Sequence, residues 1–379
     1  MKSKLFMLAA AAAALASCSS DEVVSENTGD AISFRTAVSG QTRAVEMTTS
    51  NLGAFNVYAM KSGTSTPYFE DVLFHQQADN SFASSAKYYW PNNQSLDFFA
   101  YAKGSDNQVT KGSYNTFSVS PSTTVPNQVD FIYAATKGRT KANSKNGVEL
   151  NFRHAESKIS LKVKNTSGTM TFDVYGWKVG YVSTGGTFTF DPNSKTDSHN
   201  DGTNSNLIPL SAWNAQPATV SGSYENTLSD TKYVGVNSAE ASVGTDMILV
   251  PQVLSGFNNY QTANLGDKLN GAYIGVKLII RNNDDVNNQL KGTVIVAGGQ
   301  NNDEGVWAVW PLTDTWEPGK HYTYVIDLKD GGYYEEQEDP DDPSTNPDPL
   351  LKNAEIKFVS VQVDEWVNVT PDTQVPFAY

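Results

Sequence analysis

The chain has 379 residues, of which 39% are hydrophobic and 11% aromatic, and its formal net charge is −14 at pH 7. This length predicts two domains with hydrophobic cores rather than a disordered chain. The acidic balance argues against nucleic-acid binding, because phosphate contacts need Lys and Arg. Cys18 is the single cysteine, so a disulfide framework is excluded, as is thiol catalysis in the chain that follows it.

The N-terminus resembles a secretory processing signal. A basic start precedes an apolar run that is too short to span a bilayer. The letters LASC at 15–18 resemble a bacterial lipobox, in which cleavage precedes a cysteine whose thiol carries a diacylglyceryl group. We therefore expect 1–18 to be a lipoprotein signal peptide with lipidated Cys18, and 19–30 to be a polar tether. An ordinary signal peptide with a chance cysteine is the alternative.

An N-terminal β-sandwich domain is expected over 31–190. Short apolar runs recur there, and Ile159, Leu161 and Val163 alternate with polar neighbours as in a half-buried strand. Runs bounded by polar turn residues are typical of strands. The expected strands cover 31–38, 52–60, 95–102, 129–135, 148–152, 158–165, 170–182 and 185–190.

A polar stretch at 191–206 carries almost no apolar residue and indicates a domain junction or a surface insertion. Short helical turns are expected near 207–215, and a C-terminal β-sandwich domain over 207–379. Because no long amphipathic helix occurs, the expected class is all-β with two sandwich-like domains. Further strands are expected at 246–254, 272–282, 290–298 and 321–328.

The chain ends in an acidic linker and a strand-like tail. Seven acidic residues and four prolines at 335–349 predict an extended, solvated linker. The tail, 354–379, changes its alternation phase in a way that predicts a β-bulge near Phe358 and Val359. A chain seldom ends in strand material behind a flexible tether unless that end docks somewhere. The alternating apolar residues of the tail are Val359, Val361, Val363, Val375, Phe377 and Tyr379.

No constellation of residues singles out an active site, so we expect no enzyme, no metal and no cofactor. The chain lacks a phosphate-binding glycine loop and a nucleophile elbow. Two Asp- and Asn-rich stretches, 197–202 and 282–288, lack the spacing of a calcium loop and are expected to be turns. The four histidines are scattered without metal-ligand spacing, and we expect structural or solvated roles for His75, His154, His199 and His321.

Three tryptophans cluster at 306–320, in the letters VWAVWPLTDTWEPGK. Alternating aromatic residues on a strand are typical of core and edge packing, which is the interpretation we favour. A tryptophan platform that binds sugar is the alternative. The three residues are Trp307, Trp310 and Trp316.

Several segments, taken in order, resemble the fimbrillin family, the type V pilus subunits of Bacteroidales. They include the lipobox leader, the TRA at 42–44, YYWPNNQSLDFFAYA at 88–102, VELNFRHAESKISLKV at 148–163 and WEPGKHYTYVIDL at 316–328. The resemblance implies two transthyretin-like β-sandwich domains. It also implies that an outer-membrane lipoprotein precursor reaches the cell surface, and that the mature form resides in a fimbrium with other pilus subunits.

The resemblance further implies how such a subunit assembles. An arginine-specific protease cuts a loop after the first strand, and that strand leaves together with the lipid anchor. A C-terminal strand of another subunit then fills the groove by β-augmentation. Transferred to this sequence, the cut falls between Arg43 and Ala44, with Arg35 as a rival that lies inside a predicted strand. The displaced strand presents Ile32, Phe34, Thr36 and Val38 on one face, and the donor strand draws on Val359, Val361, Val363, Val375 and Phe377.

Three alternatives stay open at the level of sequence. Arg43 is a solvated loop residue that is never cut, the subunit has an accessory or anchor role rather than a stalk role, or the protein is a surface lipoprotein that binds glycan or host protein without polymerising. A hydrolase is a weaker possibility, because no catalytic group stands out.

Overall fold

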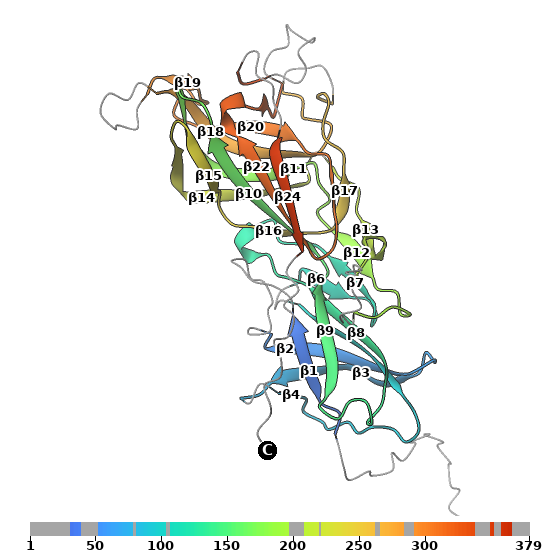
Figure 1. Ribbon diagram of the computed structural model, residues 1–379. Coiled ribbons are helices and arrows are strands. Elements are labelled where there is room, and N and C mark those ends of the chain that lie inside the picture. Colours follow the sequence, from blue (N-terminus) through green and yellow to red (C-terminus); the bar gives the residue numbers. More distant parts are fainter. Residues whose placement is uncertain are drawn as a thin grey trace, which may run out of the picture.

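The structure, a computed structural model, describes residues 31–38, 52–78, 81–103, 107–196, 208–219, 221–261, 266–283, 292–337, 349–351 and 358–365. The all-β prediction is confirmed, with β-sheets packed around separate cores (Figure 1). The helical elements of the described part are the short turns η1 (Val125–Asn127), η2 (Leu210–Ala212) and η3 (Leu328–Asp330). A search of the same residues for helices that could span a bilayer finds none.

Seven N-terminal strands form a sheet that closes on itself, in the order β1-β4-β3-β2-β5-β8-β9 and back to β1. Apolar side chains, many of them phenylalanines, fill its interior. The strands are β1 (Phe34–Val38), β2 (Ala54–Lys61), β3 (Pro67–Gln76), β4 (Phe82–Ala83), β5 (Leu96–Ala102), β8 (Ile132–Arg139) and β9 (Val148–His154).

Strand β5 is buried on both faces, and this explains its continuous apolar sequence LDFFAYA. Phe98 and Ala100 face the interior of the closed sheet, whereas Phe99 and Tyr101 face a second core outside it. That second core lies under a four-stranded sheet with the order β13-β12-β7-β6. Its strands are β6 (Val109–Lys111), β7 (Thr116–Val119), β12 (Gly186–Thr189) and β13 (Trp213–Ala215).

Two sheets form the C-terminal sandwich. One has the order β15-β10-β22-β24, with β16 also paired to β10, and the other has the order β14-β11-β18-β20-β23, with β19 paired to β18. A separate pair joins β17 (Gln252–Leu254) and β21 (Asp314–Trp316). The sandwich strands are β10 (Ser157–Asn165), β11 (Met170–Gly180), β14 (Ser223–Val234), β15 (Ser238–Ser242), β16 (Met247–Leu249), β18 (Tyr273–Asn282), β19 (Val294–Val296), β20 (Val306–Pro311), β22 (Lys320–Asp327), β23 (Tyr333–Tyr334) and β24 (Phe358–Glu365).

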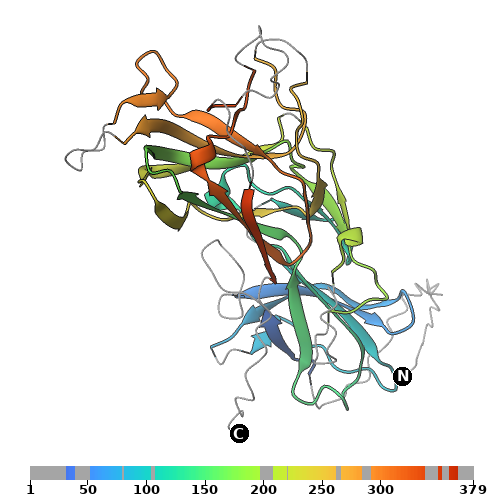
Figure 2. The same cartoon turned by 45° about the horizontal axis from the view of Figure 1, so that its top comes forward.

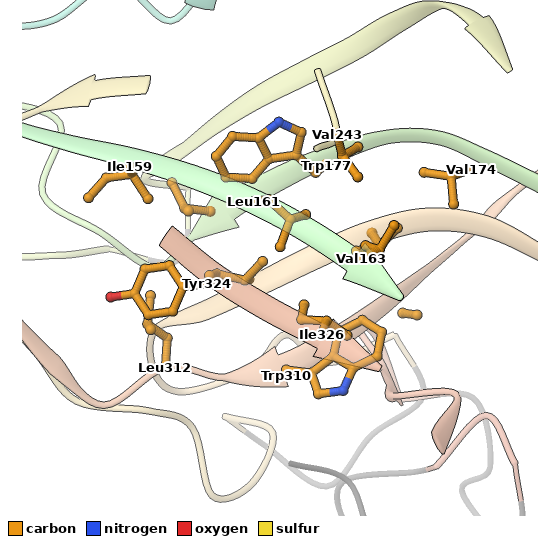
Figure 3. Packing of buried hydrophobic residues seen from close by; sticks show 14 of the residues in the cluster. Ile159, Leu161, Val163, Val174, Trp177, Val243, Trp310, Leu312, Tyr324 and Ile326 are labelled. Carbon is orange, nitrogen blue, oxygen red and sulfur yellow. The ribbon is translucent and has the colours of Figure 1, made fainter. Parts of the chain in front are cut away.

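The core of the sandwich follows the predicted alternation. Ile159, Leu161 and Val163 of β10 are at most 1% exposed and face the same interior as Tyr324 and Ile326 of the neighbouring β22 (Figure 3). The opposite sheet supplies Trp177 and Trp310, also fully buried.

The expected domain boundary at 190 differs from the sheet arrangement. Strands β10 and β11 lie before that boundary, yet they pair with β22 and β18 of the C-terminal sandwich. The chain crosses from the N-terminal sheet to the C-terminal sandwich directly after β9, in the green part of the ribbon (Figure 2). Ala155 and Glu156 connect β9 to β10. An alternating pattern indicates that one face of a strand is buried, but it does not indicate which sheet the strand joins. The expected domain boundary at 190 therefore lies too late in the sequence.

The ends of the expected acidic linker are also packed rather than solvated. Glu335 pairs with Lys178, Gln337 is 2% exposed, and Pro349 forms a bridge with Tyr333. The middle of that segment, 338–348, lies outside the described residues. The difference from the expected solvated linker has a physical cause. The carboxylate of Glu335 lies beside the buried Lys178 and is held in place instead of extending into water.

Candidate functional site

Strand β1 closes the N-terminal sheet. It runs parallel to β9 over five paired residues, from Phe34 opposite Val148 to Val38 opposite Phe152, whereas β4 meets it through one pair. Just before the strand, the amide of Ile32 donates to the carbonyl of Tyr88 at 2.7 Å. The backbone of β1 therefore lies between two neighbours, and one long ladder supplies most of its pairing.

Two apolar side chains, one on β1 and one just before it, anchor this segment to the core. Ile32 and Phe34 are 6% and 4% exposed. The Phe34 ring meets the rings of Phe74 and Phe98 edge-on, with centroids 4.8 Å and 5.4 Å apart. Thr36 is half-buried, and the Val38 side chain lies outside the description. Burial of two such side chains contributes about 3–6 kcal/mol to folding, an upper estimate.

Arg35 points the other way from Phe34. Its side chain is 54% exposed, and Nη2 lies 2.7 Å from Oε2 of Glu149 on β9. Its backbone belongs to the β1–β9 ladder, where a protease cannot bind it as an extended substrate. Arg43 and Ala44 lie outside the described residues, as does Cys18.

The second element of the candidate site is strand β24, which belongs to the expected donor segment. It runs antiparallel to β22 at the edge of its sheet (Figure 1). The register skips from Ser360 to Phe358, which leaves Val359 as an extra residue, so the predicted β-bulge is confirmed. Val375 and Phe377 of the expected donor segment lie outside the described residues, and the side chain of Val359 is not described either.

The valines of β24 are poorly covered. Val361 and Val363 stand opposite Tyr324 and Tyr322, whose side chains face the core. A residue directly opposite another on a paired strand points to the same sheet face. Even so, Val361 and Val363 are 41% and 52% exposed. The strand thus extends the sheet beyond the edge of the core, and its apolar face gains little burial there.

The tryptophan cluster is part of the core. Trp310 and Trp316 are fully buried, and Nε1 of Trp316 donates to the hydroxyl of Tyr324 at 2.8 Å. Trp307 is half-buried beneath the ammonium of Lys178, 4.0 Å from the ring centroid. The predicted packing role is confirmed for Trp310 and Trp316, and the three residues do not present a shared flat face to a sugar.

Two histidines lie in polar contacts that sequence patterns did not reveal. Nδ1 of His154, 2% exposed, lies 2.8 Å from Oδ2 of Asp130. Nε2 of His321 lies 2.6 Å from the hydroxyl of Ser160, which donates to Asp246 at 2.6 Å. Because that hydroxyl proton goes to Asp246, the histidine nitrogen donates to the serine oxygen and does not act as its base. His75 is exposed, and His199 lies outside the described residues.

Glu156 lies at the crossing between the two cores and is 1% exposed. Its Oε2 accepts from the amide of Phe131 at 3.0 Å, whereas its Oε1 has no hydrogen-bond partner among the described residues. Burial, and then the negative charge of Asp130, raise the pKa of Glu156 well above its usual value. Burial therefore favours the protonated form of this carboxyl. Across the described residues, no group of histidines, cysteines and carboxylates is arranged to hold a metal ion.

Among the described residues, these features define an all-β protein whose first strand buries its inner face and whose last strand is poorly covered. A model of the fimbrillin-like family matches residues 42–345, and the chain belongs to this family. Membership indicates a structural, non-enzymatic protein. Comparison with curated proteins finds no significant match.

Three solved structures are similar to this chain, and the fimbrial protein among them shows the same fold. A fimbrial protein from Bacteroides vulgatus aligns with a TM-score of 0.54 at 16% identity, over 88% of this chain and 99% of that one. A putative cell adhesion protein from Bacteroides ovatus aligns at 15% identity over 90% and 99%, with a TM-score of 0.45. A putative cell adhesion protein from Bacteroides uniformis aligns at 16% identity over 89% and 98%, also with a TM-score of 0.45. At 16% identity the likeness to the fimbrial protein concerns the fold alone.

Proposed function

We propose that the protein is a structural subunit of a surface fimbria, exported as a lipoprotein and polymerised by strand exchange after proteolytic removal of its N-terminal strand. Membership of the fimbrillin-like family supports a fimbrial role. The observation that carries the finer proposal is the position of β1, which closes the N-terminal sheet with Ile32 and Phe34 buried.

Removal of β1 creates a site for another strand. Strand β9 loses its pairing with β1 along all five paired residues. The space left by Phe34 is lined by Phe55, Phe74 and Phe98. An exposed strand edge beside an apolar groove favours β-augmentation, in which backbone hydrogen bonds give affinity and alternate side chains fill pockets.

The tail suits this role because its exposed apolar side chains would become buried when it moves into the groove. Val361 and Val363 are about half exposed against β22, whereas Ile32 and Phe34, which pack into the N-terminal sheet, are at most 6% exposed. Transfer of such a valine into a closed site contributes about 1 kcal/mol. The exchange replaces a poorly covered contact within one subunit by a buried contact between two.

One cut serves two purposes in this account. Lipidated Cys18 holds the precursor at the outer membrane, and β1 keeps the groove filled until export is complete. Cleavage between Arg43 and Ala44 by an arginine-specific surface protease then releases the anchor and opens the groove together. Arg35 is disfavoured as the cut site because its backbone is hydrogen-bonded to β9.

The test is brief trypsin treatment of the refolded, unlipidated protein, followed by sequencing of the new N-terminus and sizing of the product. The proposal predicts a chain beginning at Ala44 and ladders of multimers. Arg43→Gln is expected to block both, and Arg35→Gln to block neither. Protein that is cut only elsewhere, or that is cut at Arg43 and stays monomeric at high concentration, would contradict the proposal.

A further inference from the structure

Both ends of the acidic segment are bound to the C-terminal sandwich, and the first bond is a buried ion pair. Nζ of Lys178, whose side chain is 9% exposed, lies 2.6 Å from Oε2 of Glu335. The hydroxyl of Tyr273 donates to the other oxygen of that carboxylate at 2.6 Å. Trp307 covers the ammonium. An ion pair shielded from water in this way is costly to break, because either partner alone is left as a buried charge.

The next residues are held by a neighbouring loop. Gln337 is 2% exposed, its amide donates to the carbonyl of Asp267 at 3.1 Å, and its carbonyl accepts from the amide of Gly266 at 2.9 Å. The hydroxyl of Tyr260 donates to the carbonyl of Tyr334 at 2.9 Å. An exposed ion pair between Lys268 and Glu336 lies beside them. The chain is therefore fixed up to Gln337.

The chain is fixed again where the acidic segment ends. Pro349 forms an antiparallel bridge with Tyr333, and the amide of Leu350 donates to the carbonyl of Gly332 at 2.9 Å. Leu350 is 7% exposed and belongs to the sandwich core, and Leu351 packs against that core. The residues on either side of 338–348 are thus both bound to the C-terminal sandwich.

From these contacts we infer that the acidic segment is not the tether of the donor strand, because a clasp formed by Lys178, Glu335, Tyr273 and the Tyr333–Pro349 bridge closes its base. The inference rests on the proposed function and specifies which part of the tail exchanges. Only the chain after Leu351 changes place, and the clasp transmits the pull of the next subunit into the sandwich. The reach from Leu351 to Phe358 is seven residues, at most about 25 Å.

A disulfide across the base tests this directly. The hydrogen bond from Leu350 to Gly332 makes Tyr333 and Pro349 a non-hydrogen-bonded pair, for which Cα atoms lie about 4.5 Å apart. That separation falls within the range that a disulfide spans. The variant is the full chain carrying Tyr333→Cys, Pro349→Cys and Cys18→Ser, compared oxidised and reduced after trypsin cleavage.

Because the clasp is inferred to stay closed during assembly, we expect the oxidised and reduced forms to assemble at rates within about twofold of each other. Loss of multimers on oxidation, with recovery on reduction, would overturn the inference, because it would mean that the base must open. If the wild-type chain also stays monomeric after cleavage, the proposed function fails instead, and the clasp is then judged by hydrogen exchange alone.

Hydrogen exchange of the uncleaved wild-type chain provides that second readout and needs no assembly. The amides of Gln337, Leu350 and Gly266 are expected to be protected. Lys178→Met is expected to speed their exchange by about tenfold or more, and the matched control Lys268→Met, which breaks only the exposed pair, by less than about twofold. Unprotected amides at Gln337 and Leu350 in the wild-type chain would overturn the inference whether or not subunits assemble.

Discussion

Phe34 of β1 meets Phe74 of β3 edge-to-face, with ring centroids 4.8 Å apart and an interplanar angle of 78°. Strand β4 lies between β1 and β3 in the sheet order, so this contact reaches past a paired neighbour of β1. The contact of Phe34 with Phe98 of β5, with centroids 5.4 Å apart, crosses the interior of the closed sheet and fixes the N-terminal strand to the far side of the core. In the proposed account, the same contact is lost when the strand leaves and is replaced when a donor strand enters.

Phe34→Ala is expected to destabilise the uncleaved protein by about 3–5 kcal/mol, because it removes a buried ring and leaves a cavity. Urea denaturation measures the change. The matched control Arg35→Ala removes an exposed side chain and is expected to cost about 1 kcal/mol or less. After cleavage at Arg43, the Phe34→Ala and wild-type chains should become indistinguishable, since the substituted strand is gone. A persistent difference would show that the strand remains bound.

Val361→Asp together with Val363→Asp is expected to change the stability of the uncleaved monomer by about 1 kcal/mol or less, because both side chains are about half exposed. The same pair should abolish multimer ladders after cleavage, since charges would enter an apolar groove. Ser360→Asp with Gln362→Asp places the charges on the other face of β24 and serves as the control. Equal ladders from both double variants would argue against β24 as a donor.

Deletion of 354–379 is expected to leave a folded, cleavable subunit that does not form ladders. Strand β24 lies at a sheet edge, so its loss uncovers β22 without opening the core between the sheets. Circular dichroism checks the fold, and denaturing gels of unheated samples show the ladders. Ladders that persist in the truncated protein would rule out this segment as the donor.

The raised pKa of Glu156 predicts that the folded protein becomes less stable as pH rises. Its pKa in the folded state is raised, chiefly by burial, so the unfolded chain loses this proton at lower pH than the folded one. Above the ordinary glutamate pKa of 4.5, unfolding is therefore favoured by about 1.4 kcal/mol per pH unit until the folded-state pKa is reached. Thermal unfolding of wild type and Glu156→Gln between pH 4 and 8 measures this difference. Parallel pH curves for the two proteins would refute it.

Local features of the fold were predictable because they depend on residues close in sequence. The alternation of Ile159, Leu161 and Val163 predicted a strand with one apolar face in the core, and all three are buried in β10. The other face was expected to be solvated, but Lys158 and Ser160 on it are buried too. The phase change in the tail predicted a bulge, and Val359 is skipped in the register with β22. Steric and hydrophobic periodicity suffice for such statements.

Long-range pairing was not predictable from the same patterns. Ile159 of β10 pairs in parallel with Tyr322 of β22, far along the chain, and no local signal assigns β10 to that sheet. The ends of the acidic segment looked solvated because the partner of Glu335 is Lys178, on strand β11, which lies far earlier in the sequence. Strand propensity depends on tertiary context, and a buried charge pair is visible only once the fold brings its members together.

The central claim, that one cut removes the lipid anchor and permits strand exchange, is tested most directly by the intact mass of the protein in fimbriae sheared from the native cell surface. The account predicts a chain that begins at Ala44 and carries no lipid. Polymeric material whose subunits still begin at lipidated Cys18 would contradict it.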